Sequence, residues 1–190
     1  MSKFDQLLVA FGANLPFGGA PPADTLRDAV AELSGQGLEV LALSRFFATP
    51  CYPAGAGPDY VNAAAVIAGG GSDDLASTLA RLHAVEALFG RRRAQRWGMR
   101  TLEIDLLAVG DSVLPDAVTQ DRWRGLPAKD QIGATPDQLI LPHPRLQDRA
   151  FVLVPLADVA PDWRHPRTGL TVRQMLAALP AADRDAVKPL

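Results

Sequence analysis

The segment of residues 90–105 holds the densest group of chemically capable side chains in this sequence. It reads GRRRAQRWGMRTLEID, and five of its residues are arginines: Arg91, Arg92, Arg93, Arg96 and Arg100. Each guanidinium presents a rigid fork of hydrogen-bond donors that matches the oxygens of a phosphate group. Charge alone leaves two other interpretations open. The segment is a solvated basic loop, or it is a loop that binds RNA with Trp97 among its arginines.

Two carboxylates follow these arginines on an expected strand. Glu103 and Asp105 alternate with Leu102, Ile104 and Leu106, and residues two apart on a strand point to the same face. Adjacent carboxylates repel each other unless a cation lies near them, and Mg²⁺ binds one or two carboxylates together with substrate phosphates. The pattern indicates phosphoryl transfer, which depends on positioning and on neutralising charge. The alternative is the solvent-facing side of an amphipathic strand.

Glu86 is a carboxylate in an unexpected place. It falls within the apolar stripe that Leu75, Leu79, Leu82 and Phe89 form at helical spacing. A carboxylate on such a face must be paired or must line a pocket. Glu86 therefore belongs either to a structural ion pair with a nearby arginine or to a ligand site.

Two other segments carry side chains suited to a planar ligand and to phosphate. Tyr60 offers a flat ring, and Asn62 offers an amide that both donates and accepts hydrogen bonds, so the pair suits the face and edge of a heterocycle. The alternative is a turn that leads into a core strand. His143 lies between two prolines, ahead of Arg149 and Phe151. It is either a partner for phosphate or an exposed loop residue.

Composition excludes several classes of protein. The chain has 190 residues, of which 48% are hydrophobic and 21% are charged, as in one ordinary globular domain. The net charge of −2 disfavours nucleic-acid or membrane binding, and the single Cys51 excludes an internal disulfide. No GxxxxGK[ST] loop is present, which disfavours a P-loop kinase. No apolar run is as long as a membrane helix. Residues 7–13 are interpreted as a strand rather than as a signal segment, so we expect a cytoplasmic protein.

The elements that would position these side chains follow the order strand, helix, strand, strand, helix, strand. We expect extended segments at residues 6–11, 38–49, 61–68 and 101–109. We expect helices capped by Asp24 and Ser72, and two more at 151–159 and 172–179. Residues 111–138 lack periodicity and are expected to form a long loop insertion or lid. This order predicts an α+β sandwich of the ferredoxin-like kind, with an antiparallel sheet and extra C-terminal helices.

Taken in order along the chain, these segments resemble the 6-hydroxymethyl-7,8-dihydropterin pyrophosphokinases of folate biosynthesis. The combination of RWGMRTLEID with PHPRLQDRAF carries the resemblance, which spans most of the chain as a single domain of residues 1–190. It implies an ATP-dependent diphosphotransferase that moves pyrophosphate from ATP to the pterin hydroxymethyl group and releases AMP. It also implies two Mg²⁺ ions. We expect a protein without nucleic-acid or membrane partners, as a monomer or alternatively as a dimer.

The resemblance also implies roles for individual residues. Glu103 and Asp105 match the metal ligands of the family, and Arg91, Arg100 and Asp105 match its catalytic residues. The implied pterin-binding residues are Thr49, Pro50, Tyr52, Tyr60, Asn62, Glu86, Trp97 and Phe151. The implied ATP-binding residues are Arg91, Arg93, Arg96, Arg100, Leu106, His143 and Arg149.

The sequence departs from the family pattern at two places that bear on function. Glu103 stands where the family usually has Asp, and the added methylene moves the carboxylate outward by about 1.5 Å. Because Mg²⁺ demands tight octahedral geometry, the alternative function is a catalytically impaired member that binds nucleotide or pterin. Residues 111–138 are longer than the usual turn, and we expect them to cover the ATP side or to form a subunit contact.

Overall fold

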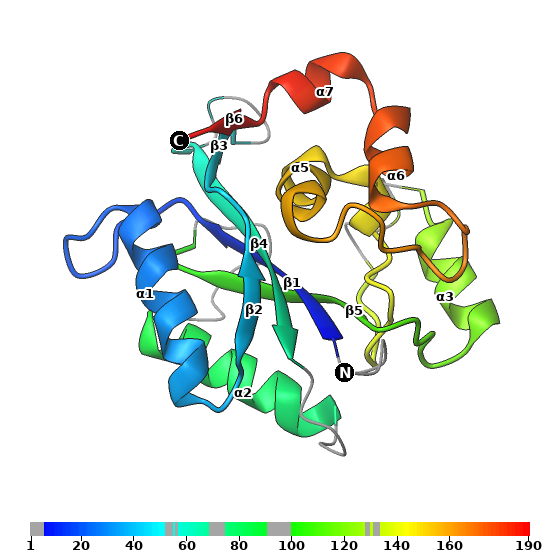
Figure 1. Cartoon of the computed structure of the whole chain (residues 1–190), viewed down its shortest axis with the longest axis horizontal. Helices are drawn as coiled ribbons and strands as arrows, with labels where there is room; N and C mark the ends of the chain where they lie inside the picture. The colour runs from blue at the N-terminus through cyan, green and yellow to red at the C-terminus, as the bar shows by residue number, and fades with distance from the viewer. Residues whose placement is uncertain are drawn as a thin grey trace.

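The described part of the chain forms a six-stranded antiparallel sheet with helices on both faces (Figure 1). The computed structural model describes residues 6–51, 55, 57–68, 75–90, 100–127, 130 and 134–190. The sheet order is β5 (Glu103–Val109), β1 (Gln6–Ala13), β4 (Tyr60–Ala68), β3 (Phe47–Thr49) and β6 (Lys188–Pro189), with β2 (Val40–Leu43) also paired to β4. The strand that begins the chain therefore lies inside the sheet, between the two strands that carry the candidate site residues.

One face of the sheet is covered by α1 (Pro22–Gly35) and α2 (Leu75–Leu88). Leu26 and Leu82 from these helices pack against Val9, Ile67 and Ile104 from the strands, and all five are buried. Fully burying such side chains contributes roughly 1.5–3 kcal/mol each. The predicted ferredoxin-like sandwich is confirmed, and the observed order β1-α1-β2-β3-β4-α2-β5 differs from the predicted βαββαβ order only because the second predicted strand is divided into β2 and β3.

The other face is covered by the C-terminal helices. These are α5 (Ala150–Val159) and α6 (Val172–Ala178), with the short α7 (Ala181–Asp185) and the 3₁₀ helix η2 (Leu146–Asp148) beside them. Leu153 and Met175 pack against Leu8, Val66 and Leu107 of the sheet. Figure 1 shows α5 and α6 across the sheet from α1 and α2. The two predicted C-terminal helices are confirmed.

Two local predictions on the first half of the chain are wrong. Asp24 does not cap α1, because the helix begins at Pro22 with Pro21 at the cap position and no side-chain cap; Asp24 instead pairs with Arg27 in the first turn. Proline suits this position because its fixed φ is helical and its missing N–H needs no partner. Residues 38–49 form β2 and β3 rather than one strand. Between them Ser44 bonds to β4 through its backbone and its hydroxyl, each at 2.9 Å.

The segment of residues 111–138 contains a helix that its sequence does not predict. This helix is α3 (Ala117–Arg124), capped by Asp116, whose side chain accepts a hydrogen bond from Thr119 N at 2.9 Å. Gln120 is its only buried residue. A short helix that buries one polar side chain leaves no apolar period in the sequence. The predicted cap of α2 at Ser72 lies outside the described residues.

Among the described helices, none is long and apolar enough to cross a membrane.

Candidate active site

The inner strand β1 pairs with two strands that carry predicted site residues. Gly12 pairs with Asn62 on β4 and with Glu103 on β5, and Ala10 pairs with Asp105. These residues share the face covered by α5 and α6, because they alternate with residues that pack under α1 and α2. The sheet register therefore brings the predicted ring-reading amide and the predicted carboxylate pair to one face, on either side of Gly12.

The amide of Asn62 is held in a fixed orientation. Asn62 and Thr49 are 5% and 6% exposed, and Asn62 Nδ2 donates to Thr49 Oγ1 over 2.6 Å. A Cβ atom at Gly12 would lie 3.1 Å from Asn62 Oδ1, so glycine leaves room beside that oxygen. Tyr60 is the strand partner of Thr49, two positions along from the pair of Asn62 and Phe47. Burial raises the pKa of Tyr60, and the nearby Cys51 raises it further, so its phenol is neutral near pH 7.

Asn14 is a site residue that the sequence reasoning missed. It is 2% exposed, and its backbone N and side-chain Oδ1 bond to Arg100 O and Arg100 N at 3.0 and 2.8 Å. Its Nδ2 also donates to Pro58 O at 3.2 Å. Asn14 thus anchors the backbone at Arg100, whose guanidinium forms an ion pair with Glu103. The available signal was a polar residue directly after a predicted buried strand.

A cluster of cationic side chains lies around Asp105. His143 N donates to Leu107 O at 2.7 Å, and His143 Nδ1 accepts from Arg145 N at 3.1 Å. Burial lowers the pKa of His143 to about 4; Asp105 opposes this effect, while Arg149 and Arg145 add to it. Its imidazole is therefore neutral near pH 7. Burial also lowers the pKa of Arg149, which Asp105 partly restores.

Glu86 is buried on α2, as its place in the apolar stripe predicts. It is 0% exposed, and its Oε1 accepts a hydrogen bond from Ile104 N at 2.8 Å. Ile104 lies between Glu103 and Asp105 on β5. The Glu86 carboxylate therefore holds the backbone that carries both predicted metal ligands, from the opposite side of the sheet. Its implied contact with pterin stays a prediction.

The remaining predicted residues lie in several settings. The side chain of Leu106 is buried in the core, so only its backbone is available to a ligand. Pro50 is exposed just after β3. Phe151, in the first turn of α5, is 41% exposed, and the Arg149 guanidinium lies 5.6 Å from the centre of its ring. Outside the described residues lie Tyr52, Arg91, Arg93, Arg96 and Trp97.

The donor set suits a magnesium ion shared with phosphate rather than a closed protein cage. Within the described parts of the chain, no three His, Cys, Asp or Glu residues gather closely enough to hold a metal alone. Glu103 and Asp105 supply two carboxylates on one face of β5. Mg²⁺ commonly takes only one or two carboxylates and completes its shell with phosphate oxygens and water. The residues present therefore fit Mg²⁺ bound together with a polyphosphate.

Comparisons with known proteins identify relatives of this chain. The family model for 7,8-dihydro-6-hydroxymethylpterin-pyrophosphokinase matches residues 8–161. A 2-amino-4-hydroxy-6-hydroxymethyldihydropteridine pyrophosphokinase from Synechocystis is 36% identical over 182 residues, covering 94% of this chain and 80% of that protein. The protein of the same name from Pseudomonas aeruginosa is 35% identical over 180 residues, covering 92% of each chain.

Solved structures share the fold at lower sequence identity. The crystal structure of wild-type Plasmodium falciparum HPPK-DHPS with SDX-DHP has a TM-score of 0.61 and 13% identity, and covers 91% of this chain. The triple-mutant S436F/A437G/A613S structure from the same organism has a TM-score of 0.63 at 14% identity. The chain spans less than half of those two proteins, 43% and 44% of their lengths. At this identity the likeness supports the fold.

Proposed function

This chain belongs to the 7,8-dihydro-6-hydroxymethylpterin-pyrophosphokinase family, and we propose that it transfers pyrophosphate from ATP to 6-hydroxymethyl-7,8-dihydropterin in folate biosynthesis. The single observation that carries the proposal beyond membership is the sheet register, in which Asn62 and Glu103 flank Gly12. A ring reader and a phosphate-metal site on the two strands that flank β1 suit one enzyme that aligns two substrates. We propose one domain for this activity, in the cytoplasm, where ATP is available.

The reaction is a single displacement at phosphorus. The hydroxymethyl oxygen of the pterin attacks the β-phosphorus of ATP and forms a new O–P bond. The bond between that phosphorus and the α,β-bridging oxygen breaks, and AMP leaves with the bonding electrons. The hydroxyl proton passes to solvent. Because the nucleophile belongs to the substrate, the enzyme needs only to align the groups, exclude water and neutralise charge.

The pterin side of the proposed site lies at β3 and β4. The fixed Asn62 amide reads the ring edge, because its bond from Nδ2 to Thr49 Oγ1 orients both its Oδ1 and its second N–H. Tyr60 and Phe151 provide the aromatic faces for stacking. The exposure of Phe151 supports this role, because 41% of a phenylalanine in the first turn of a helix remains open to a ligand.

The phosphate side draws on Arg100, Arg149 and His143. Arg100 starts in an ion pair with Glu103, so binding of polyphosphate gives it a second anionic partner. Arg149 lies near Asp105 and keeps its charge for phosphate oxygens. The neutral His143 offers a hydrogen bond without adding charge. Among residues beyond the described ranges, we propose Arg91, Arg93 and Arg96 for ATP and Trp97 for closure of the site.

Glu103 and Asp105 are the residues that would hold Mg²⁺, and we propose two ions shared with ATP. Bound Mg²⁺ supplies neutralisation of the polyphosphate charge in this reaction. The Glu103 side chain, one methylene longer than Asp, forms an ion pair with Arg100. That ion pair is the observation that favours the second candidate function, a member that binds its ligands yet turns over slowly.

The decisive experiment measures AMP formation from ATP and Mg²⁺ with and without 6-hydroxymethyl-7,8-dihydropterin. We expect AMP that depends on the pterin, together with a pterin diphosphate of the matching mass. ADP in place of AMP would overturn the pyrophosphoryl assignment. Saturable binding of pterin and ATP without turnover would favour the second candidate, and Glu103→Asp would then be expected to restore turnover.

A further inference from the structure

The loop that carries His143 is held at three successive residues. Leu141 exchanges two backbone hydrogen bonds with Leu114, at 2.8 and 3.1 Å. The Pro142 carbonyl accepts a hydrogen bond from Gln120 Nε2 of α3 at 3.1 Å, and His143 N donates to Leu107 O. Gln120 is 0% exposed, so water cannot readily replace its amide if the side chain is changed.

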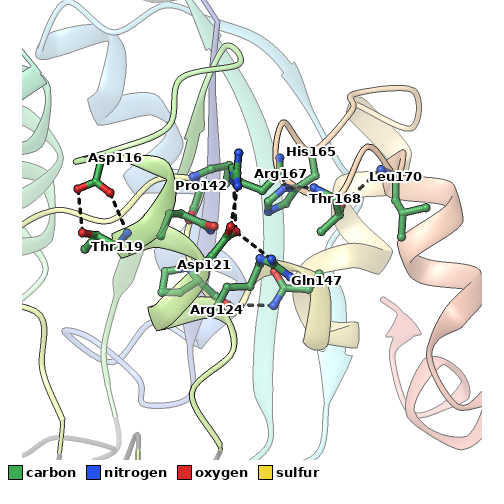
Figure 2. Close-up of polar contacts among 12 residues, drawn as sticks. Asp116, Thr119, Asp121, Arg124, Pro142, Gln147, His165, Arg167, Thr168 and Leu170 are labelled. Carbon is green, nitrogen blue, oxygen red and sulfur yellow. Dashed lines mark hydrogen bonds and ion pairs between the residues drawn. The ribbon is translucent and has the colours of Figure 1, made fainter.

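The helix that supplies Gln120 is tied in turn to the segment before α6. The Asp121 carboxylate accepts hydrogen bonds from Arg167 Nη2 at 2.6 Å, from Arg167 Nε at 3.2 Å and from Arg124 Nη2 at 2.9 Å. Figure 2 shows this carboxylate between α3 and the turn that holds Arg167 and His165. The two Arg167 bonds, and then Arg124, hold the pKa of Asp121 well below its usual range. The pair is therefore charged throughout the neutral pH range.

The turn on the far side of this ion pair has its own fixed shape. His165 is buried, and its Nδ1 accepts hydrogen bonds from the backbone N of Arg167 at 3.1 Å and of Thr168 at 3.4 Å. The Trp163 indole N–H donates to Gly110 O at 2.9 Å, just beyond β5. A rigid turn thus connects the end of β5 to Asp121. Residue 167 lies beyond residues 8–161, the stretch that matches the family model.

We propose that Gln120, Asp121 and Arg167 form a brace that positions the His143 loop for ATP. These three are positioning residues: Gln120 holds the loop carbonyl, while Asp121 and Arg167 hold the helix that carries Gln120. The inference rests on the proposed function, since it assigns His143 and Arg149 to the ATP side. It gives the insertion 111–138 a role at the ATP end of the site.

The brace acts on one substrate because of where it lies. His143 and Arg149 come from a loop and the residue before a helix rather than from paired strands, so their geometry depends on contacts that hold the loop. Asn62 and Thr49 lie on paired strands and are held by a hydrogen bond to each other rather than by the brace. Loosening the brace should therefore weaken ATP binding and leave pterin binding intact.

The test uses the full chain with Gln120→Met and Asp121→Asn. Calorimetry with Mg²⁺ and α,β-methylene ATP measures nucleotide affinity, and a second titration measures pterin affinity. We expect about a five- to tenfold weaker Kd for the ATP analogue in Gln120→Met and about threefold in Asp121→Asn, with the pterin Kd within about twofold of wild type. Amide exchange at His143 should also become faster, while exchange on β4 should not change.

Asp158→Asn is the matched control. Asp158 forms a similar bidentate ion pair, in which it accepts hydrogen bonds from Arg45 Nε and Nη2 at 2.9 Å each, and it lies on α5 rather than on α3. This variant should leave the analogue Kd unchanged. An analogue Kd in both brace variants equal to that of the control would overturn the brace, even if the wild type forms AMP. If wild-type protein binds the analogue but forms no pterin-dependent AMP, the proposed turnover is refuted. The brace is then still tested by comparing the analogue Kd of the two brace variants with that of Asp158→Asn. Wild-type protein that does not bind the analogue would overturn both proposals.

Discussion

The two ends of the candidate site are built in different ways. The proposed pterin end lies on paired strands, where Asn62 and Thr49 are buried and joined by a 2.6 Å hydrogen bond. The proposed phosphate end combines Asp105 on β5 with Arg100, three residues before that strand. It also draws on His143 and Arg149, which lie in the later segment that leads into α5. One end is set by the sheet itself, and the other depends on contacts between distant segments.

This difference suits the two ligands. A flat heterocycle is recognised by a fixed edge and face, which strands supply with little freedom. A polyphosphate whose charge shifts during the reaction needs cations gathered from several directions. Substitutions at the pterin end should therefore change pterin affinity alone, whereas substitutions at the phosphate end should change the rate.

The largest expected effect comes from Asp105→Ala. Removing this carboxylate removes a proposed metal ligand and a negative charge that acts on both His143 and Arg149. We expect a loss of about a thousandfold in kcat, measured as AMP formation, with pterin binding retained. The control is Asp111→Ala, an exposed residue just past β5, which should keep full activity. Substantial turnover in Asp105→Ala would contradict the metal role.

Arg100→Ala should have the next largest effect. Its ion pair with Glu103 and its backbone bonds to Asn14 hold this side chain at the phosphate end. If its contact with phosphate strengthens in the transition state, kcat should fall about a hundredfold while the KM for ATP changes only a few-fold. Steady-state kinetics at varied ATP concentration provide the measurement. An equal loss in binding and in turnover would instead indicate simple ground-state binding.

Asn62→Ala tests the other end of the comparison. It removes the proposed ring reader and leaves the buried Thr49 hydroxyl without its donor. We expect the KM for pterin to rise about tenfold or more, since losing a buried hydrogen bond costs about 1–3 kcal/mol, while the KM for ATP stays near that of wild type. If the KM for ATP rose in parallel, the two ends would be one coupled unit, and the distinction drawn between them would fail.

The smallest expected effect concerns stability at the C-terminal turn. Burial, followed by the charge of Arg124, lowers the pKa of His165 to about 4. The unfolded chain, with a pKa of about 6.5, binds the proton more readily, so this histidine's contribution is complete above that pH and is lost as the pH falls toward 4, by at most about 3 kcal/mol. Urea unfolding of wild type and His165→Asn at pH 7.5 and 4.5 should show a smaller pH dependence in the variant. The exposed His83→Asn should behave like wild type.

Much of the fold follows from local patterns in the sequence. Alternation around Glu103 and Asp105 predicts β5, and helical spacing predicts the buried position of Glu86, since both patterns report one covered face. Local patterns fail where two neighbouring residues are both suited to begin a helix. Asp24 is a good capping residue, yet Pro22 takes the first helical position and moves the start of α1 upstream of the predicted cap.

Local sequence patterns do not predict contacts between residues that are far apart in the chain. The pairing of Asn62 with Gly12 depends on the register between β4 and β1. Several registers would bury the same face of both strands, so the sequence does not select one. Asn14 bonds to Arg100 across 86 positions of sequence, and no periodic pattern reports such a pair. The helix α3 was not predicted for a related reason. Its contacts with the rest of the protein are hydrogen bonds to residues 142 and 167, and such bonds leave no apolar stripe in the sequence.

The Glu86 carboxylate has a consequence for how this protein meets copies of itself. Among the strands that the structure describes, β5 is the outermost at its end of the sheet, and an open strand edge is a template for pairing with another chain. Here the outward N–H of Ile104 is taken by Glu86, and the carbonyl of Leu107 is taken by His143. These two bonds cover part of the sheet border at the strand that carries the candidate metal ligands, which makes pairing of another chain along β5 less favourable.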